Sequence, residues 1–322
     1  MPRANLENPV SSSAALPAQL QHSRASLAIS LQQSIDSSIH DREDTLAVEE
    51  PLEIQLAYGP RSSRKLKSIS VTMRTPGDDA SLAAGFLKTE GVVREPEDIV
   101  SIHYAAAAEI TASIDGAILS PDSAGNIIRV ELDESIEPNV ASLARNFYTT
   151  SSCGICGKAS LLALQAVGPP RVHNTFTCAA ETVYTLPEKL NAAQTLFRRT
   201  GGLHGAGLFD CAGELQDVSE DVGRHNAVDK LLGKAFLADR LPLRDRLLLL
   251  SGRASFELLQ KAVMAGIPVV VAVGAPSSLA VRVARQFDIT LVGFLRDRRF
   301  NIYSGADRII AGGGPPPAGA TP

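Results

Sequence analysis

The chain has 322 residues, of which 44% are hydrophobic, and a formal net charge of −4 at pH 7. This length allows a substantial core and either one large domain or two ordinary domains. The net negative charge disfavours a nucleic-acid-binding protein that relies on a broad basic surface. The sequence has no run of about 18 apolar residues, so no membrane span is predicted. Four cysteines in a chain of this size do not form a disulfide framework, which favours a reducing, cytoplasmic location.

The first part of the chain predicts a disordered extension followed by a small α+β region. Residues 1–44 are rich in Ser, Ala and Gln and have only scattered apolar residues, so we expect no stable structure there. We expect the α+β region over 45–150, where residues 52–56 and 69–73 alternate in hydrophobicity and predict a β-hairpin. Further predicted elements are helices over 80–90 and 140–146 and strands over 99–104 and 126–132.

From residue 151 to 311, predicted helices and strands follow one another. The strands are expected over 208–209, 215–218, 247–250, 268–273 and 289–294, and the helices over 158–167, 187–199, 226–236, 255–265 and 277–287. Short apolar strands that alternate with helices predict a parallel sheet covered on both faces. The Gly/Pro-rich tail at 312–322 is predicted to be disordered.

The most reactive feature of the sequence is the pair Cys153 and Cys156, which is framed by glycines and precedes a predicted helix. A helix N-terminus and a Cys-x-x-Cys spacing both lower a thiol pKa, so a thiolate at neutral pH is expected. Four interpretations stay open: a structural zinc site, thioredoxin-like exchange, a persulfide-carrying sulfurtransferase and an inert turn. Zinc normally takes four ligands, and Cys178 and Cys211 are solitary.

Several other residues are candidates for binding an anion. His204 lies in a glycine-rich segment, and Arg224 and His225 begin a predicted helix whose N-terminus favours negative charge. For Arg224 the alternative is a helix cap in which Asp221 pairs with it. The loops at 251–255 and 274–278 each follow a strand, where ligands bind in parallel sheets. A third loop carries Arg296, Asp297, Arg298 and Arg299, which form either a phosphate site or a solvated turn.

Five segments together resemble the formate dehydrogenase accessory sulfurtransferase (FdhD) family. They are AGFLKTEG at 84–91, SCGICG at 152–157, EDVGRHNAVDKLLG at 220–233, SGRASFE at 251–257, and LVGFLR at 291–296 with NIY at 301–303. The resemblance covers about residues 49–310. It implies a cytoplasmic protein that takes sulfur from a cysteine desulfurase and delivers it to the molybdenum cofactor of formate dehydrogenase.

The resemblance also implies roles for particular residues. Cys153 carries the persulfide and Cys156 assists or relays sulfur. The bis(molybdopterin guanine dinucleotide) cofactor is held by a segment near the C-terminus, and His204, Arg224 and His225 are further candidates for lining the site. The six residues of the cofactor-binding segment are Phe294, Leu295, Arg296, Asp297, Arg298 and Arg299.

For the fold, the resemblance implies a three-layer α/β/α unit similar to that of cytidine deaminases, beside the smaller α+β part, and a homodimer. The zinc signature of the deaminases is missing, so neither deamination nor a structural metal is predicted. We expect no nucleic-acid or membrane partner. Two alternatives to a sulfurtransferase are a cofactor-binding chaperone without sulfur chemistry and a zinc-stabilised scaffold.

Overall fold

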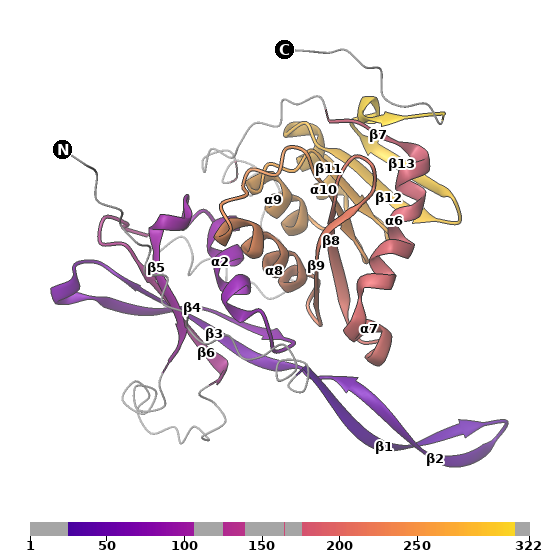
Figure 1. Cartoon of the computed structure of the whole chain (residues 1–322), viewed down its shortest axis with the longest axis horizontal. Coiled ribbons are helices and arrows are strands. Elements are labelled where there is room, and N and C mark those ends of the chain that lie inside the picture. The colour runs from indigo at the N-terminus through magenta and orange to yellow at the C-terminus, as the bar shows by residue number, and fades with distance from the viewer. Residues whose placement is uncertain (1–24, 106–124, 139–163, 165–175, 313–322) are drawn as a thin grey trace, which may run out of the picture.

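The structure, a computed structural model, describes residues 25–105, 125–138, 164 and 176–312. Within these residues the chain forms an N-terminal part built on a four-stranded sheet, a larger C-terminal part built on a six-stranded sheet, and a projecting two-stranded ribbon (Figure 1). The predicted helices at 140–146 and 158–167 and the pair Cys153 and Cys156 lie outside the described residues, apart from Leu164.

The four-stranded sheet confirms the predicted N-terminal hairpin, helix and strands. Its strands run in the order β4-β3-β6-β5, and α2 covers one face. The alternating residues Leu52, Ile54 and Leu56 are fully buried because they all point towards α2, as a period of two requires. The bounds are β3 Glu50–Tyr58, β4 Lys65–Arg74, α2 Asp79–Thr89, β5 Ile99–Tyr104 and β6 Ile127–Leu132.

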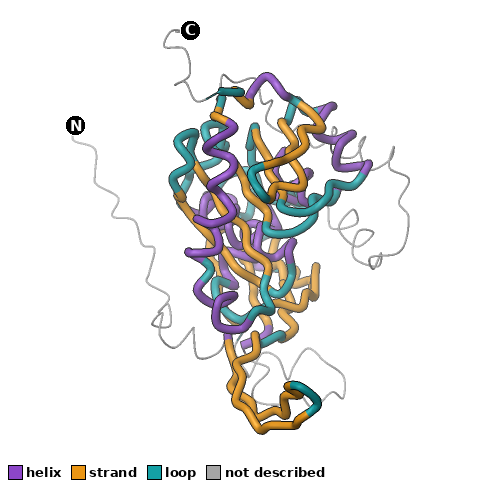
Figure 2. Tube along the Cα trace, turned by 90° about the vertical axis from the view of Figure 1, so that its right-hand side faces the viewer, coloured by secondary structure: helices purple, strands orange, loops and turns teal. Residues whose placement is uncertain are grey.

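The prediction of a disordered extension over 1–44 is wrong for its second half. Strands β1 (Ser26–Ile35) and β2 (Ser38–Ala47) form an antiparallel ribbon joined by Asp36 and Ser37, both with positive φ. The composition failed to predict it because a ribbon with two exposed faces needs few apolar residues. Figure 2 shows the ribbon projecting from the body of the molecule.

The six-stranded sheet has the order β13-β12-β11-β10-β8-β9. Only β10, β11 and β12 are mutually parallel, whereas β8, β9 and β13 run antiparallel to their neighbours, so the predicted parallel sheet is mixed. The strand bounds are β8 His204–Phe209, β9 Leu215–Asp221, β10 Leu247–Leu250, β11 Val269–Ala272, β12 Thr290–Arg296 and β13 Arg299–Ser304. Short strands β7 (Cys178–Ala179) and β14 (Ile309–Ile310) pair separately.

Helices cover this sheet on both faces and give the expected three layers. Along β10, Leu248 and Leu250 pack in the core beneath α8, α9 and α10, whereas Leu247 and Leu249 pack in the core beneath α6. Two apolar faces on one strand explain its uninterrupted run of leucines. The helices are α6 Ala180–Ala193, α7 Thr195–Thr200, α8 Arg224–Leu237, α9 Phe256–Met264 and α10 Ser278–Gln286.

The predicted helix over 187–199 has the wrong start. Helix α6 begins at Ala180 and contains Pro187 in its interior, and a separate short helix, α7, follows it. Proline favours the first turn of a helix, but tertiary packing of Val183, Leu186 and Leu190 against the sheet outweighs that preference here.

The two parts of the molecule are joined by close contact between α2 and α8. A Cβ atom added to Gly85 would lie 1.9 Å from the Asp229 carbonyl oxygen, and one added to Gly233 would lie 1.8 Å from the Ser81 carbonyl oxygen. Only glycine permits this approach of two helix backbones. Among the described residues, no helix is long and apolar enough to cross a membrane.

Candidate anion-binding edge of the sheet

The loops that follow the three parallel strands lie at one edge of the six-stranded sheet and are held together by backbone hydrogen bonds. The Gly274 amide donates to the Gly252 carbonyl at 2.9 Å, and the Phe294 amide donates to the Gly274 carbonyl at 3.0 Å. A Cβ atom on Gly274 would lie 3.0 Å from the Gly252 carbonyl oxygen, so glycine permits this close loop packing. The sequence prediction that these loops gather at one edge is confirmed.

His204 lies at the same edge because β8 runs antiparallel to β10 and begins where β10 ends. A Cβ atom on Gly252 would lie 3.4 Å from His204 Nδ1, so the imidazole is beside the loop after β10. Partial burial lowers the His204 pKa, and the positive charges of Arg224 and Arg253 lower it further. A neutral ring is therefore favoured at neutral pH.

Arg224 and His225 occupy the first turn of α8, which begins directly after β9 at this edge. The His225 Nε2 lies 3.3 Å from the Ser255 hydroxyl and 3.8 Å from a Glu257 carboxylate oxygen. Burial, followed by the charge of Lys261, lowers the His225 pKa to about 4. The Arg224 Nε is buried and has no hydrogen-bond partner among the described residues.

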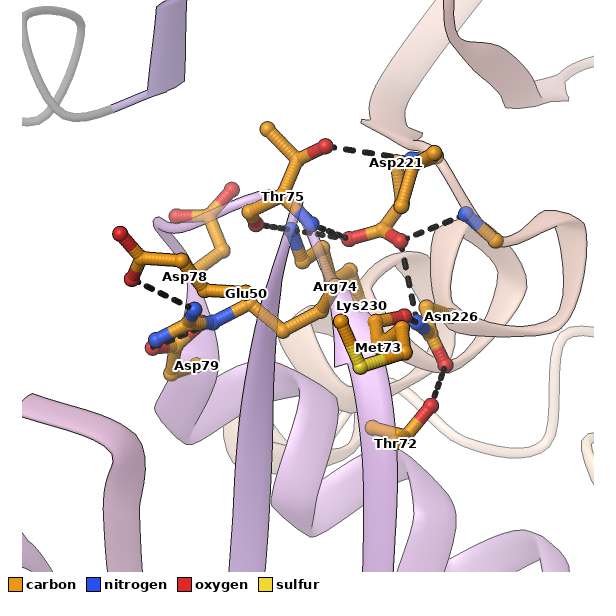
Figure 3. Close-up of polar contacts among 12 residues, drawn as sticks. Glu50, Thr72, Met73, Arg74, Thr75, Asp78, Asp79, Asp221, Asn226 and Lys230 are labelled. Atoms are coloured by element: carbon orange, nitrogen blue, oxygen red, sulfur yellow. Dashed lines mark hydrogen bonds and ion pairs between the residues drawn. The ribbon is translucent and has the colours of Figure 1, made fainter. Parts of the chain in front are cut away.

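Asp221 lies just before this turn, and its carboxylate accepts hydrogen bonds from the turn and from neighbouring segments (Figure 3). One carboxylate oxygen, Oδ1, accepts from the Gly223 amide at 2.8 Å and from Asn226 Nδ2 at 3.0 Å. The other, Oδ2, accepts from Lys230 Nζ at 2.7 Å and from the Thr75 amide at 3.1 Å. Asp221 thus pairs with Lys230, and the alternative cap with Arg224 does not form, which leaves Arg224 at the edge.

The network continues into the N-terminal part of the chain. Asn226 Nδ2 donates to the Met73 carbonyl at 2.7 Å, and the Thr72 hydroxyl donates to Asn226 Oδ1 at 3.1 Å. Lys230 Nζ also donates to the Thr75 carbonyl at 2.7 Å. The end of β4 and the following residue therefore fix the loop that presents Arg224 and His225.

The predicted cofactor-binding segment forms the β12–β13 hairpin. Asp297 and Arg298 occupy its two-residue turn with φ of 51° and 52°, and Arg296 pairs with Arg299 across it. Phe294 has a φ of 56° and an exposed ring, whereas the Leu295 side chain is buried in the core beneath α6. A left-handed backbone is strained for a bulky residue, and the hydrogen bond from the Phe294 amide to the Gly274 carbonyl helps to hold this conformation.

The three arginines of this hairpin are not equivalent. Arg298 forms an ion pair with Glu181 of α6 at 2.5 Å, and its guanidinium lies 5.1 Å from the centre of the Tyr184 ring. Arg296 and Arg299 are exposed and form no ion pair within the described residues. Two guanidinium groups therefore remain open to an anionic ligand, while the third is held against α6.

The structure places the predicted binding residues in two groups along one edge. His204, Arg224 and His225 form the first group near β8, and the second is on β12. Because β10 and β11 lie between β8 and β12, the groups are three strand spacings apart, about 14 Å. Arg253 adds positive charge beside His204; it lies in the loop at 251–255 that the sequence indicated as a ligand-binding loop, although no role for this residue was predicted.

The two cysteines that the structure describes differ in exposure. Cys178 is buried in the core beneath α6, and burial raises its pKa to about 12, whereas Cys211 is exposed in the turn between β8 and β9. Cys178 is therefore a protonated core residue. Among the described residues, no cluster of three or more His, Cys, Asp or Glu side chains could hold a metal ion.

The chain is thus an α/β protein with a mixed six-stranded sheet, and basic residues lie in the loops at the carboxyl ends of its parallel strands. The chain belongs to the FdhD/NarQ family, whose model matches residues 47–310.

The chain is similar to several proteins named sulfur carrier protein FdhD. The protein from Streptomyces coelicolor is 50% identical over 276 residues, covering 85% of this chain and 92% of the relative. The one from Mycobacterium tuberculosis is 50% identical over 274 residues, covering 83% and 92%. A more distant relative from Picrophilus torridus is 39% identical over 267 residues, covering 83% and 92%.

The fold is similar to a crystal structure from Desulfotalea psychrophila, a protein assigned as a formate dehydrogenase accessory protein. The TM-score is 0.64 at 24% identity, and the match covers 89% of this chain and 100% of the other. At this level of identity the comparison supports the fold of both parts.

Proposed function

We propose that this chain is a sulfur carrier that loads sulfur as a persulfide on Cys153 and delivers it to a guanine-dinucleotide molybdenum cofactor for formate dehydrogenase. The observation that carries the proposal is the 50% identity over 276 residues to a sulfur carrier protein FdhD. The basic edge of the sheet supports it, because an acceptor with pyrophosphate groups needs guanidinium donors.

In the first step, the Cys153 thiolate attacks the terminal sulfur of the persulfide on a cysteine desulfurase. The sulfur–sulfur bond of the donor breaks, its cysteine leaves as a thiolate, and Cys153 gains the terminal sulfur as its own persulfide. The exchange is balanced without an external oxidant or reductant. In the second step the Cys156 thiolate would attack the Cys153 sulfur that is bonded to carbon, so that a Cys153–Cys156 disulfide forms and the terminal sulfur leaves as hydrosulfide for the molybdenum of the cofactor; the two thiols would supply the two electrons.

The residues at the edge fit such a cargo. Arg296 and Arg299 are exposed without ion pairs in the described part of the chain, and the exposed Phe294 ring offers a stacking surface to a guanine base. The Arg224 Nε is a buried donor that lacks a partner among the described residues. Together these groups would hold the phosphates and the base while Cys153 acts.

The proposal includes a cytoplasmic location, a homodimer and contacts with a cysteine desulfurase and formate dehydrogenase. It also includes a cytidine-deaminase-like arrangement of the C-terminal layers. The support for that arrangement is α6 on one face of the mixed sheet and α8, α9 and α10 on the other.

Intact-mass measurement tests the sulfur step. After incubation with a cysteine desulfurase and cysteine, the wild type should gain one sulfur that a reductant removes, Cys153→Ala should not, and Cys211→Ala should load like the wild type. An undiminished adduct on Cys153→Ala would refute the assignment. If Cys153→Ala/Cys156→Ala restores formate dehydrogenase activity in cells that lack the wild-type protein, the chain is a cofactor chaperone.

Guanine-nucleotide binding tests the edge. In calorimetric titrations with GDP, Arg296→Gln and Arg299→Gln should each weaken binding by about tenfold or more, since charged hydrogen bonds to phosphate contribute roughly 1.5–3 kcal/mol. Arg298→Gln is the matched control, because that guanidinium is already held by Glu181. Equal losses in all three variants would contradict the proposed difference between these arginines.

A further inference from the structure

The edge of the sheet that carries the basic residues also carries an exposed carboxylate. Glu257 lies in the first turn of α9, two residues after Ser255. Its side chain is 60% exposed, and one carboxylate oxygen lies 3.8 Å from His225 Nε2. The positive charge of Arg224 acts on the same carboxylate, which therefore lies beside the first turn of α8. Glu257 has no part in the proposed sulfur step, so an acidic group at this basic edge needs its own explanation.

The Glu257 side chain is ionised and held in place. Partial burial raises its pKa, but hydrogen bonds from its own backbone amide and from the Ser255 side chain, together with the nearby charges, bring the pKa below its ordinary value. An ionised carboxylate can only accept hydrogen bonds, and its two oxygens have room for several. Because most of this side chain is exposed, part of its acceptor capacity is open to a ligand.

The same contacts fix the proton on His225. The Ser255 hydroxyl has one hydrogen, which it donates to Glu257, so its oxygen accepts from His225 Nε2 at 3.3 Å. Burial lowers the His225 pKa to about 4, which keeps the ring neutral at pH 7. A neutral imidazole carries a single proton, and these contacts assign it to Nε2. His225 and Ser255 therefore both present a donor to the neighbourhood of the Glu257 carboxylate and hold its orientation.

An acceptor at this edge restricts the ligand that fits. Arg253 and the N-termini of α8 and α9 favour a negatively charged ligand, whereas the Glu257 carboxylate repels a phosphate that comes close. The carboxylate stabilises a ligand only where the ligand presents N–H groups to it. A ring with an N–H group beside an amino group meets this requirement with two parallel hydrogen bonds. A phosphate ester of such a ring fits the donors and the acceptor of the edge together.

We propose that Glu257 recognises the 2-amino-4-oxopyrimidine ring of a phosphate-bearing ligand by accepting hydrogen bonds from its ring N–H and its amino group. Guanine and pterin both contain this ring, and they are the two ends of the cofactor in the proposed function, on which the inference rests. His225 and Ser255 are positioning residues, because each contacts the carboxylate. The carboxylate thereby selects against a ring that lacks the amino group.

The position of Glu257 along the edge suits a ligand that also reaches the β12–β13 hairpin. The loop after β10 leads into α9, and β10 and β12 are two strand spacings apart, about 10 Å. Arg296 and Arg299 of the hairpin are exposed. A ligand whose ring contacts Glu257 can therefore extend its phosphates towards these guanidinium groups.

Matched ligands test the inference in calorimetric titrations of the full chain. GDP is compared with IDP, which lacks the 2-amino group, and neopterin with its 2-oxo analogue. The wild type should bind the amino-bearing member about tenfold more tightly or better in at least one pair, and that pair identifies the ring as guanine or pterin. Glu257→Gln should abolish the preference, because its amide replaces one acceptor with a donor. Ser255→Ala should reduce the preference severalfold, and Glu188→Gln, an exposed position on α6, should keep it.

A wild type that binds none of the four ligands, or that shows no preference within either pair, would refute the inference. So would a Glu257→Gln variant that binds all ligands more weakly with the preference unchanged, since that result identifies a residue that only supports the start of α9. The persulfide measurement on Cys153 is independent. Sulfur loading without a ring preference would reject the role of Glu257 and leave the sulfur step standing, and a ring preference without sulfur loading would do the reverse.

Discussion

Lys230 and Asp221 form a buried ion pair within the C-terminal part of the molecule, and both side chains also bond to Thr75 of the N-terminal part. The Lys230 Nζ lies 2.7 Å from Asp221 Oδ2, and the two side chains are only 3% and 0% exposed. The same lysine donates to the Thr75 carbonyl, and the same carboxylate accepts from the Thr75 amide. A contact between α8, the end of β9 and the loop after β4 thereby fixes the turn that carries Arg224 (Figure 3).

Removing one member of this pair should destabilise the protein strongly. We expect Lys230→Met to lower the free energy of unfolding by about 3–5 kcal/mol, since it leaves the Asp221 carboxylate buried without its counter-charge. Urea denaturation followed by circular dichroism measures the change. The control is Lys234→Met, which removes the partly exposed pair with Asp78 and should cost about 1 kcal/mol or less. Equal losses in both variants would contradict the importance of the buried pair.

Because α2 and α8 lie so close together, even a methyl side chain at Gly233 should destabilise the protein strongly. Gly233→Ala should lower the free energy of unfolding by about 3 kcal/mol or more, because its Cβ would lie 1.8 Å from a carbonyl oxygen of α2 and force the helices apart. Gly202→Ala is the matched control. Its Cβ would have an ordinary contact of 3.6 Å, so the change should stay within about 0.5 kcal/mol. A tolerated Gly233→Ala would show that these helices pack less closely.

His225 should make stability depend on pH in the mildly acidic range. Its pKa in the folded chain is lowered to about 4 from 6.5, so the unfolded chain takes up a proton first as the pH falls. The stability that the neutral His225 ring contributes to the folded chain is therefore fully present above about pH 6.5 and is lost as the pH falls towards 4. With 38% of the side chain exposed, solvent screening reduces the size of the effect.

Replacing the titrating ring tests this behaviour. Between pH 7 and pH 4.5, the urea midpoint of the wild type should fall more than that of His225→Gln. His40→Gln, on the exposed ribbon, should follow the wild type. If His225→Gln keeps the full pH dependence, another group is responsible.

The two described cysteines should differ widely in reactivity. At pH 8 in the native protein, iodoacetamide should modify exposed Cys211 and leave Cys178 unmodified, because burial raises the Cys178 pKa to about 12 and shields its sulfur. Peptide mass mapping after labelling gives the result, and labelling in urea should reach both. Rapid native modification of Cys178 would show that the core beneath α6 opens.

Local patterns were sufficient to predict most elements. The leucines at 247–250 gave the bounds of β10 correctly, because four apolar residues between turn signals have few alternatives to a buried strand. The hairpin of β3 and β4 followed from strict alternation. The helix starting at Ala180 was missed because tertiary packing outweighs the positional preference of Pro187. The ribbon was missed because the polar composition of residues 1–44 outweighed the alternation of Leu27, Ile29 and Leu31, and β2 has no such alternation.

The sequence by itself predicted the family, a Cys-x-x-Cys pair at Cys153 and Cys156, most of the strands and helices of the body, and the gathering of basic loops at one edge of a sheet. The tertiary structure alone decided which charges are available there. Asp221 takes Lys230 as its partner, and Arg298 takes Glu181, so Arg224, Arg296 and Arg299 face the edge instead. Ion-pair partners come from segments distant in the chain, and local spacing cannot rank them because only the packed fold sets their distances and burial.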